Sequence, residues 1–208
     1  MTEDEAKAAI EKIVSRETLE LLNEYAAFLT KWQGAINLVS QSSLSEMWSR
    51  HFLDSAQIFQ YRPDDATSWL DIGSGAGFPG MVCALMAKDA APNLKFSFVE
   101  SDIRKCVFLR AVAHELEIEA DVISDRIEIA IPQGADVLTA RALAPLVRLC
   151  EFATRHMKPD GTAFFLKGER FEAEVAAAQD KWMMDLTTLP SETSLVGKIL
   201  KVRNIQRV

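Results

Sequence analysis

The stretch Trp69-Leu70-Asp71-Ile72-Gly73-Ser74-Gly75-Ala76-Gly77-Phe78-Pro79-Gly80 decides the fold. A short apolar run stops at four glycines, which predicts a strand, a tight turn and then a helix. Glycine adopts positive φ and lets another molecule approach the main chain, so we expect this turn to press its backbone against a ligand. Pro79 fits the first position of the helix, whose exposed amino end favours polar or anionic groups. Because Gly75-x-Gly77-x-x-Gly80 also satisfies the dinucleotide fingerprint, the motif predicts a fold but not a cofactor.

From Ser68 onward, short apolar runs alternate with helical patterns, which is typical of an α/β protein with a doubly wound parallel sheet. Pro190–Gly197 is too short for a crossover helix, so we expect this mostly parallel sheet to end in an antiparallel strand. A helix is expected at Asp102–Leu116, with Ile103, Val107, Ala111 and Val112 buried. A turn is expected at Pro159–Gly161. The seven predicted strands are Ser68–Ile72, Lys95–Val99, Ala120–Ile123, Val137–Ala140, Thr162–Leu166, Met183–Leu189 and Lys198–Arg203.

The first third of the chain predicts helices that cover the sheet. The periodicity indicates one helix from about Ala6 to Trp32, ended by Gly34. A second amphipathic stretch follows, capped by Ser43 or Ser45. A chain of 208 residues suits one domain, so we expect a single domain at 1–208, with 1–62 as a helical N-terminal cap.

The composition indicates an ordinary soluble protein, with 49% hydrophobic and 25% charged residues. No apolar run approaches the ~20 residues of a membrane span, and the acidic amino end lacks the features of a signal peptide, so we expect a cytoplasmic protein. The three cysteines and three histidines have no ligand spacing, so we expect no metal and interpret the thiols as core residues. The net charge of −7 argues against nucleic-acid binding through the overall field but permits a local basic surface. We also expect a monomer.

The ends of the predicted strands offer the candidate ligand contacts, because ligands of doubly wound sheets bind there. Glu100 ends the second strand, where an acidic residue takes the ribose hydroxyls of a nucleoside ligand. Ile127, after the third strand, is suited to an adenine face. Cations also gather at these ends and predict phosphate contacts with a polynucleotide. They are Arg104, Lys105, Arg126, Arg141 and Lys167.

Six segments together resemble the RsmG (GidB) family of small-subunit ribosomal RNA methyltransferases. The resemblance runs in register from about Gly34 to Gly168. Ala140 differs, since serine is frequent there in the family. The matching segments are Asn37-Leu38-Val39, Arg50-His51-Phe52-Leu53-Asp54-Ser55, Asp71–Gly80, Ser124-Asp125-Arg126-Ile127-Glu128, Arg141-Ala142 and Leu166-Lys167-Gly168.

The resemblance implies a class I methyltransferase (Rossmann-like) fold that uses S-adenosylmethionine. It implies transfer of a methyl group to N7 of a guanine in the 530 loop of 16S rRNA, at a position of the 527 type. The partner is then 16S rRNA or the small ribosomal subunit. The cofactor contacts of the family fall on Gly73, Phe78, Ile127, Glu128 and Arg141, and the turn itself adds Gly75.

The residues after the fourth strand agree with an N7 target. Guanine N7 has an accessible lone pair, so we expect catalysis by positioning, with no catalytic base and with Arg141 as the candidate for a positioning role. An amine methyltransferase would show an Asp/Asn-Pro-Pro-aromatic turn where this chain has Thr139-Ala140-Arg141-Ala142, and a C5 enzyme would need a Pro-Cys pair. Two alternatives stay open: a nicotinamide oxidoreductase, and a non-catalytic RNA-binding or assembly factor.

Overall fold

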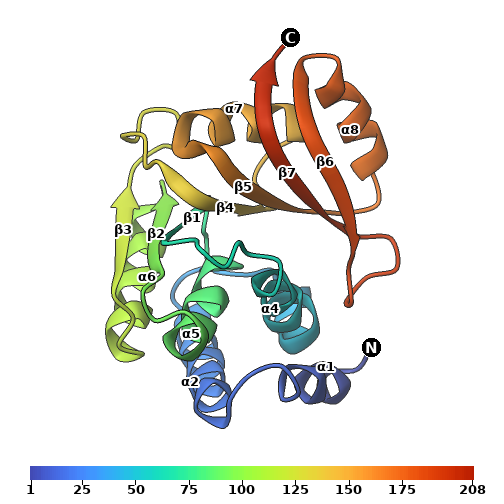
Figure 1. Cartoon of the computed structure of the whole chain (residues 1–208). Helices are drawn as coiled ribbons and strands as arrows, with labels where there is room; N and C mark the ends of the chain where they lie inside the picture. The colour runs from blue at the N-terminus through green and yellow to red at the C-terminus, as the bar shows by residue number, and fades with distance from the viewer.

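The computed structural model describes residues 1–208 as a seven-stranded sheet with helices on both faces (Figure 1). The strands are β1 (Ser68–Ile72), β2 (Lys95–Glu100), β3 (Ala120–Ser124), β4 (Ala135–Arg141), β5 (Met157–Lys167), β6 (Trp182–Pro190) and β7 (Lys198–Arg207). The helices are α1 (Glu3–Ile10), α2 (Arg16–Gln33), α3 (Gln41–Leu44), the π-helix η1 (Trp48–Leu53), α4 (Asp54–Phe59), α5 (Gly80–Ala90), α6 (Ile103–Glu115), α7 (Leu146–His156) and α8 (Phe171–Gln179).

The strand order is β3-β2-β1-β4-β5-β7-β6, so the predicted seven strands are confirmed. Strands β1 to β5 pair in parallel, whereas β7 is antiparallel to both of its neighbours. The antiparallel hairpin predicted at the end of the sheet is confirmed, since β6 and β7 pair antiparallel, with β7 inside the sheet and β6 at its edge. The burial of the two strands explains this order: β7 carries the buried residues Ile199, Leu200 and Val202, whereas most of β6 is exposed or half-buried.

The expected turn at Pro159–Gly161 is instead an irregular part of β5. Ala135 pairs with Met157, and Val137 already pairs with Thr162, so β5 contains extra residues between two neighbouring pairs. Such a bulge accommodates a proline and a glycine that regular pairing would exclude. The strand therefore begins earlier than the sequence predicted.

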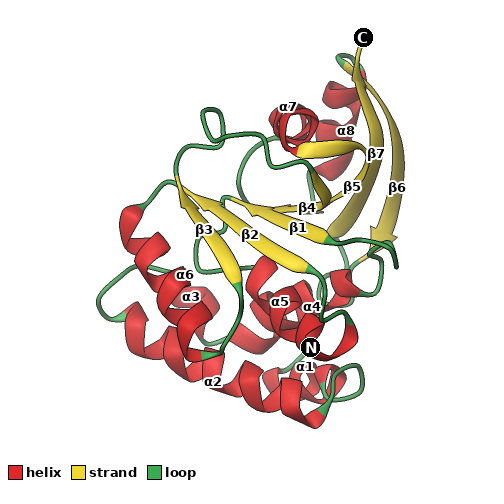
Figure 2. Cartoon of the chain, turned by 60° about the vertical axis from the view of Figure 1, so that its left-hand side comes forward, coloured by secondary structure: helices red, strands yellow, loops and turns green.

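Two apolar cores lie on opposite faces of the sheet, as expected for a doubly wound fold. Figure 2 shows α7 and α8 on one face, and α2, α5 and α6 on the other. Consecutive residues of β1 alternate between the cores: Trp69 belongs to the cluster on the α5 side and Leu70 to the cluster on the α7 side. Cys83, Cys106 and Cys150 are all buried, which confirms the interpretation of the thiols as core residues.

The amino-terminal helices differ in detail from the prediction. The single helix expected from Ala6 to Trp32 is interrupted, and α2 starts after Ser15, whose side chain accepts a hydrogen bond from Thr18 N at 3.0 Å. Gly34 ends α2 as predicted. Ser40, and not Ser43 or Ser45, caps the next helix.

Helix α6 buries Val112 as predicted, but two other residues predicted to be buried are exposed. Ile103 is 71% exposed and Val107 is 48% exposed, whereas Phe108 and Leu109 are fully buried. The aromatic ring of Phe108 packs edge-on against Trp32 of α2, with 5.7 Å between the ring centroids. Contact with the amino-terminal helices therefore determines how α6 is rotated.

Candidate functional site

The glycine turn between β1 and α5 has the left-handed backbone that the sequence predicted. The φ angles are +62° at Gly73, +56° at Gly75 and +94° at Gly77. The hydroxyl of Tyr25 in α2 donates a hydrogen bond to Ala76 O, and a Cβ added at Gly77 would lie 2.6 Å from that hydroxyl. The amino-terminal helices therefore hold the turn by direct contact. Helix α5 begins at Gly80, with Pro79 as its cap residue and not as its first helical residue.

Glu100 connects the turn to the start of α6. One carboxylate oxygen accepts a hydrogen bond from Gly75 N at 2.8 Å, and the other accepts one from Asp102 N at 2.8 Å. The residue is 8% exposed. The structure thus brings Glu100 to the glycine turn, as predicted, with both oxygens bonded to the main chain.

Asp71 lies beneath the turn, with its side chain fully buried. Burial raises the pKa of its carboxyl group from 3.8 to about 7, although hydrogen bonds favour the charged form. The hydroxyl of Thr139 donates to Asp71 Oδ1 at 2.6 Å and accepts from Trp69 Nε1 at 3.0 Å. At neutral pH this carboxyl group is therefore partly protonated.

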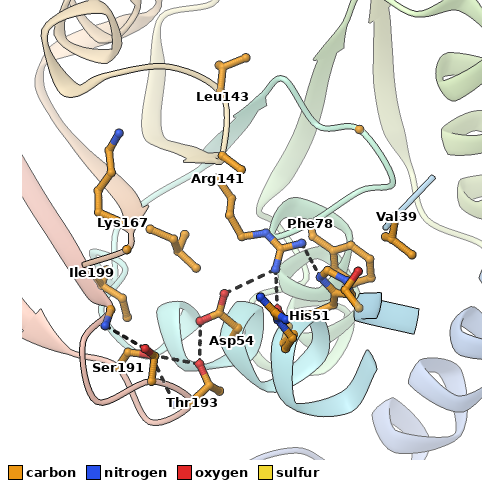
Figure 3. Close-up of a pocket in the computed structure, with 18 of the residues that line it drawn as sticks. Val39, His51, Asp54, Phe78, Arg141, Leu143, Lys167, Ser191, Thr193 and Ile199 are labelled. Atoms are coloured by element: carbon orange, nitrogen blue, oxygen red, sulfur yellow. Dashed lines mark hydrogen bonds and ion pairs between the residues drawn. The ribbon is translucent and has the colours of Figure 1, made fainter. Parts of the chain in front are cut away.

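A cavity of about 1010 Å³ opens between the turn, the ends of β4 and β5, the residues around η1 and the β6–β7 connection (Figure 3). It brings together five of the predicted site residues: Gly73, Gly75, Phe78, Arg141 and Lys167. Leu143 lies over the turn, since a Cβ added at Gly73 would be 2.5 Å from its Cδ1. Glu100, Ile127 and Glu128 do not line this cavity.

The guanidinium group of Arg141 is the centre of a polar cluster in the cavity wall. Its Nη1 donates to Arg50 O at 2.7 Å and to Asp54 Oδ2 at 3.4 Å, and its Nη2 lies 2.8 Å from His51 Nδ1. The guanidinium carbon lies 5.2 Å from the centroid of the Phe78 ring, a cation–π distance. Figure 3 shows Arg141 reaching from β4 toward these residues.

His51 is neutral in this cluster. Burial, and then the positive charges of Arg141 and Arg50, lower its pKa to about 3. Because Arg141 donates to Nδ1, the ring proton is on Nε2, which is buried without a hydrogen-bond partner. The imidazole stacks on Phe78 with 4.9 Å between centroids. His51 thus acts as a hydrogen-bond acceptor for Arg141 and carries no charge.

The loop after β3 places Ile127 and Glu128 away from the cavity. Ile127 is buried, and its carbonyl oxygen lies 2.8 Å from His156 Nε2. Glu128 is exposed and forms an ion pair with Arg148 at 3.3 Å. Because β3 pairs in parallel with β2, this loop follows a strand end adjacent to that of Glu100.

The predicted RNA-binding cations fall into two groups. Arg104 and Lys105 lie in the first turn of α6, which follows β2. Arg126 follows β3, the strand that pairs with β2. Arg104 is exposed and pairs with Asp102 at 3.1 Å. Lys167 lies apart in the cavity, where only 9% of its side chain is exposed and its ammonium group donates to Glu174 and Ala144 O at 2.7 Å each. The four cations therefore do not form one continuous rim.

Sequence reasoning gave no role to His51, Asp54 and Thr193, which the structure brings to Arg141 directly or through one another. His51 and Asp54 occur in the quoted Arg50–Ser55 segment, and their spacing of three residues puts both on one helical face. That spacing was the available signal. No sequence pattern points to Thr193, because it is a lone threonine in a loop.

Two further observations concern metals and membranes. The structure contains no group of three or more His, Cys, Asp and Glu side chains arranged to hold a metal ion. None of its helices combines the length and the apolar character that a membrane crossing requires.

Residues 18–202 match the family described as GidB, rRNA small subunit methyltransferase G. The chain belongs to this family. A ribosomal RNA small subunit methyltransferase G of Cereibacter sphaeroides is 46% identical over 94% of this chain and 95% of its own length. The protein of the same description from Paramagnetospirillum magneticum is 48% identical over 93% of this chain and 92% of its own length. The family resemblance read from the six sequence segments is thereby confirmed.

Solved structures confirm the class I methyltransferase fold. A SAM-dependent methyltransferase from Aquifex aeolicus superposes with a TM-score of 0.57 at 13% identity, covering 80% of this chain and 93% of its own. The mitomycin 7-O-methyltransferase MmcR gives a TM-score of 0.61 at 17% identity, over 88% of this chain and 67% of its own. At these identities the likeness establishes the fold alone.

Proposed function

We propose that this chain transfers a methyl group from S-adenosylmethionine to N7 of a guanine in the 530 loop of 16S rRNA. The observation that carries the proposal is the pairing of the glycine turn with Glu100 at the end of β2, in a member of a small-subunit rRNA methyltransferase family. The family match gives no support to the first alternative, a nicotinamide oxidoreductase. The protein acts as a cytoplasmic monomer on 16S rRNA or the small ribosomal subunit.

The residues fit this methyl donor. A Cβ added at Gly75 would have no neighbour closer than 3.8 Å, so one side of the turn is open to a ligand. Three of the five N–H donors of Arg141 bond to protein acceptors, which leaves two for a ligand in the cavity. Gly73, Gly75, Phe78 and Arg141 would hold the donor from the cavity side. Glu100, Ile127 and Glu128, at the ends of β2 and β3, would hold its adenosine part.

The bound sulfonium compound supplies an electrophilic methyl group. Guanine N7 offers a lone pair to such a methyl group and carries no proton that would have to leave. The cavity agrees with a reaction that needs no base: His51 has a pKa of about 3 and its acceptor nitrogen is bonded to Arg141, and Asp54 is paired with Arg141. The side chains therefore bind, orient and exclude water.

RNA binding is assigned to the exposed cations Arg104 and Arg126 and to the half-buried Lys105. A chain of net charge −7 attracts a polyanion only through a local group of cations, and these three follow adjacent strands. Lys167, which the sequence predicts to contact RNA, is instead buried against Glu174, and we assign it to the cavity wall.

The test is turnover on purified small subunits that lack the methyl group. The protein with methyl-labelled S-adenosylmethionine should transfer one label to one guanine, and borohydride followed by aniline should cleave the product RNA there. A label on a ribose oxygen or an exocyclic amine would contradict the N7 assignment. Stable subunit binding without any label transfer would favour the second alternative, a non-catalytic assembly factor.

A further inference from the structure

The Arg141 cluster joins three segments that are far apart in the sequence. Arg141 ends β4, Asp54 starts α4, and Thr193 lies in the connection between β6 and β7. Figure 3 shows Asp54 between the other two side chains. Thr193 is the one member of this chain of contacts that does not touch Arg141 itself.

Asp54 uses its two carboxylate oxygens for different purposes. Oδ1 accepts from Thr193 Oγ1 at 2.9 Å and from Gln57 Nε2 at 2.9 Å. Oδ2 faces Arg141 Nη1 at 3.4 Å. One oxygen is thus fixed by neutral donors, while the other is directed at the guanidinium group. Burial raises the pKa of Asp54, and Arg141 and Thr193 act against that shift by stabilising the charged form.

The β6–β7 connection is anchored to α4 next to this contact. Glu192 N donates to Gln57 Oε1 at 2.8 Å, and the hydroxyls of Ser191 and Thr193 lie 3.0 Å apart. Gln57 therefore contacts both Asp54 and the connection. The carboxyl-terminal hairpin is in this way linked by hydrogen bonds to the residue that faces Arg141.

We propose that Asp54 is a positioning residue for Arg141 and that Thr193 holds Asp54 in that role. The inference rests on the proposed function, in which the two remaining donors of Arg141 contact the bound methyl donor. A long arginine side chain loses conformational freedom when a ligand fixes it, and contacts that fix it beforehand increase the affinity. The hairpin, which contributes no predicted ligand contact, thereby determines how tightly the cofactor binds.

Calorimetry with S-adenosylmethionine tests the inference on the full-length protein. Thr193→Val keeps the shape of the side chain but removes the donor to Asp54, and should weaken the cofactor Kd about fivefold, the effect of one hydrogen bond. Thr193→Ser keeps a hydroxyl and should restore the parental Kd. Asp54→Asn removes the charge that faces Arg141 and should weaken the Kd about 30-fold.

A matched control and a double mutant separate positioning from general damage. Thr188→Val makes the same substitution on exposed β6, where the threonine hydroxyl has no side-chain partner, and should leave the Kd unchanged. Thr193→Val should have almost no further effect in the Asp54→Asn background, because both act through one contact. Urea unfolding should show that Thr193→Val stays folded and loses no more than about 1 kcal/mol of stability, the contribution of that one hydrogen bond.

A parental Kd in Thr193→Val, failure of Thr193→Ser to restore binding, or independent effects in the double mutant would overturn the inference. These outcomes differ from a failure of the proposed function. In that case the unmodified protein itself would neither bind S-adenosylmethionine nor methylate the small subunit.

Discussion

Asp71→Asn tests how strongly the protein interior beneath the glycine turn disfavours a charge. The pKa of Asp71 is raised by burial from 3.8 to about 7 in the folded protein. Between these values the unfolded chain loses its proton while the folded protein keeps it. Each pH unit in that interval therefore lowers the free energy of unfolding by about 1.4 kcal/mol. Over the whole interval the free energy of unfolding falls by roughly 4 kcal/mol. This loss of stability is absent below pH 3.8 and complete above pH 7.

The asparagine variant has no such titration, so its stability relative to the parent protein should rise with pH. Urea unfolding of both proteins between pH 4 and pH 8 measures the difference, which should grow by roughly 4 kcal/mol in favour of the variant. His51, whose pKa is lowered to about 3, gives the opposite pH dependence in both proteins and cancels in the difference. Asp64→Asn, at an exposed position, is the control and should show a constant difference. A constant difference for Asp71→Asn as well would refute a raised pKa at this position.

Three further changes address the turn and the RNA surface. Gly77→Ala should destabilise the fold by about 2 kcal/mol in urea unfolding, because an alanine at φ +94° is strained and its Cβ would lie 2.6 Å from the Tyr25 hydroxyl. An unchanged unfolding midpoint would contradict this account. Gly75→Val should abolish cofactor binding in calorimetry while the protein stays folded, because φ is +56° and the new side chain would enter the open side of the turn. Retained affinity in a folded variant would rule out this pocket. Reversal of Arg104 and Lys105 to glutamate should reduce the salt dependence of RNA binding by about two units of slope without changing cofactor affinity, and normal methylation in moderate salt would show that RNA binds elsewhere.

The sequence by itself determined the local features that depend on neighbouring residues. The short apolar run in Ser68–Ile72 specified a strand, and the glycines after it specified a left-handed turn, because few other residues adopt positive φ. The position of Glu100 at the end of its strand was enough to predict its place beside that turn, since parallel strands end at the same edge of a sheet.

The tertiary structure alone decided the features that depend on long-range contacts. Helical periodicity did not reveal that Ile103 is exposed, because the packing of α6 against α2 determines which face is buried. The place of β7 inside the sheet depends on which strand of the hairpin covers β5. The contacts among Asp54, Arg141 and Thr193 join residues 87 and 139 positions apart from Asp54, and no local pattern encodes such pairings. They form only when the sheet places the end of β4, the start of α4 and the carboxyl-terminal hairpin around one cavity.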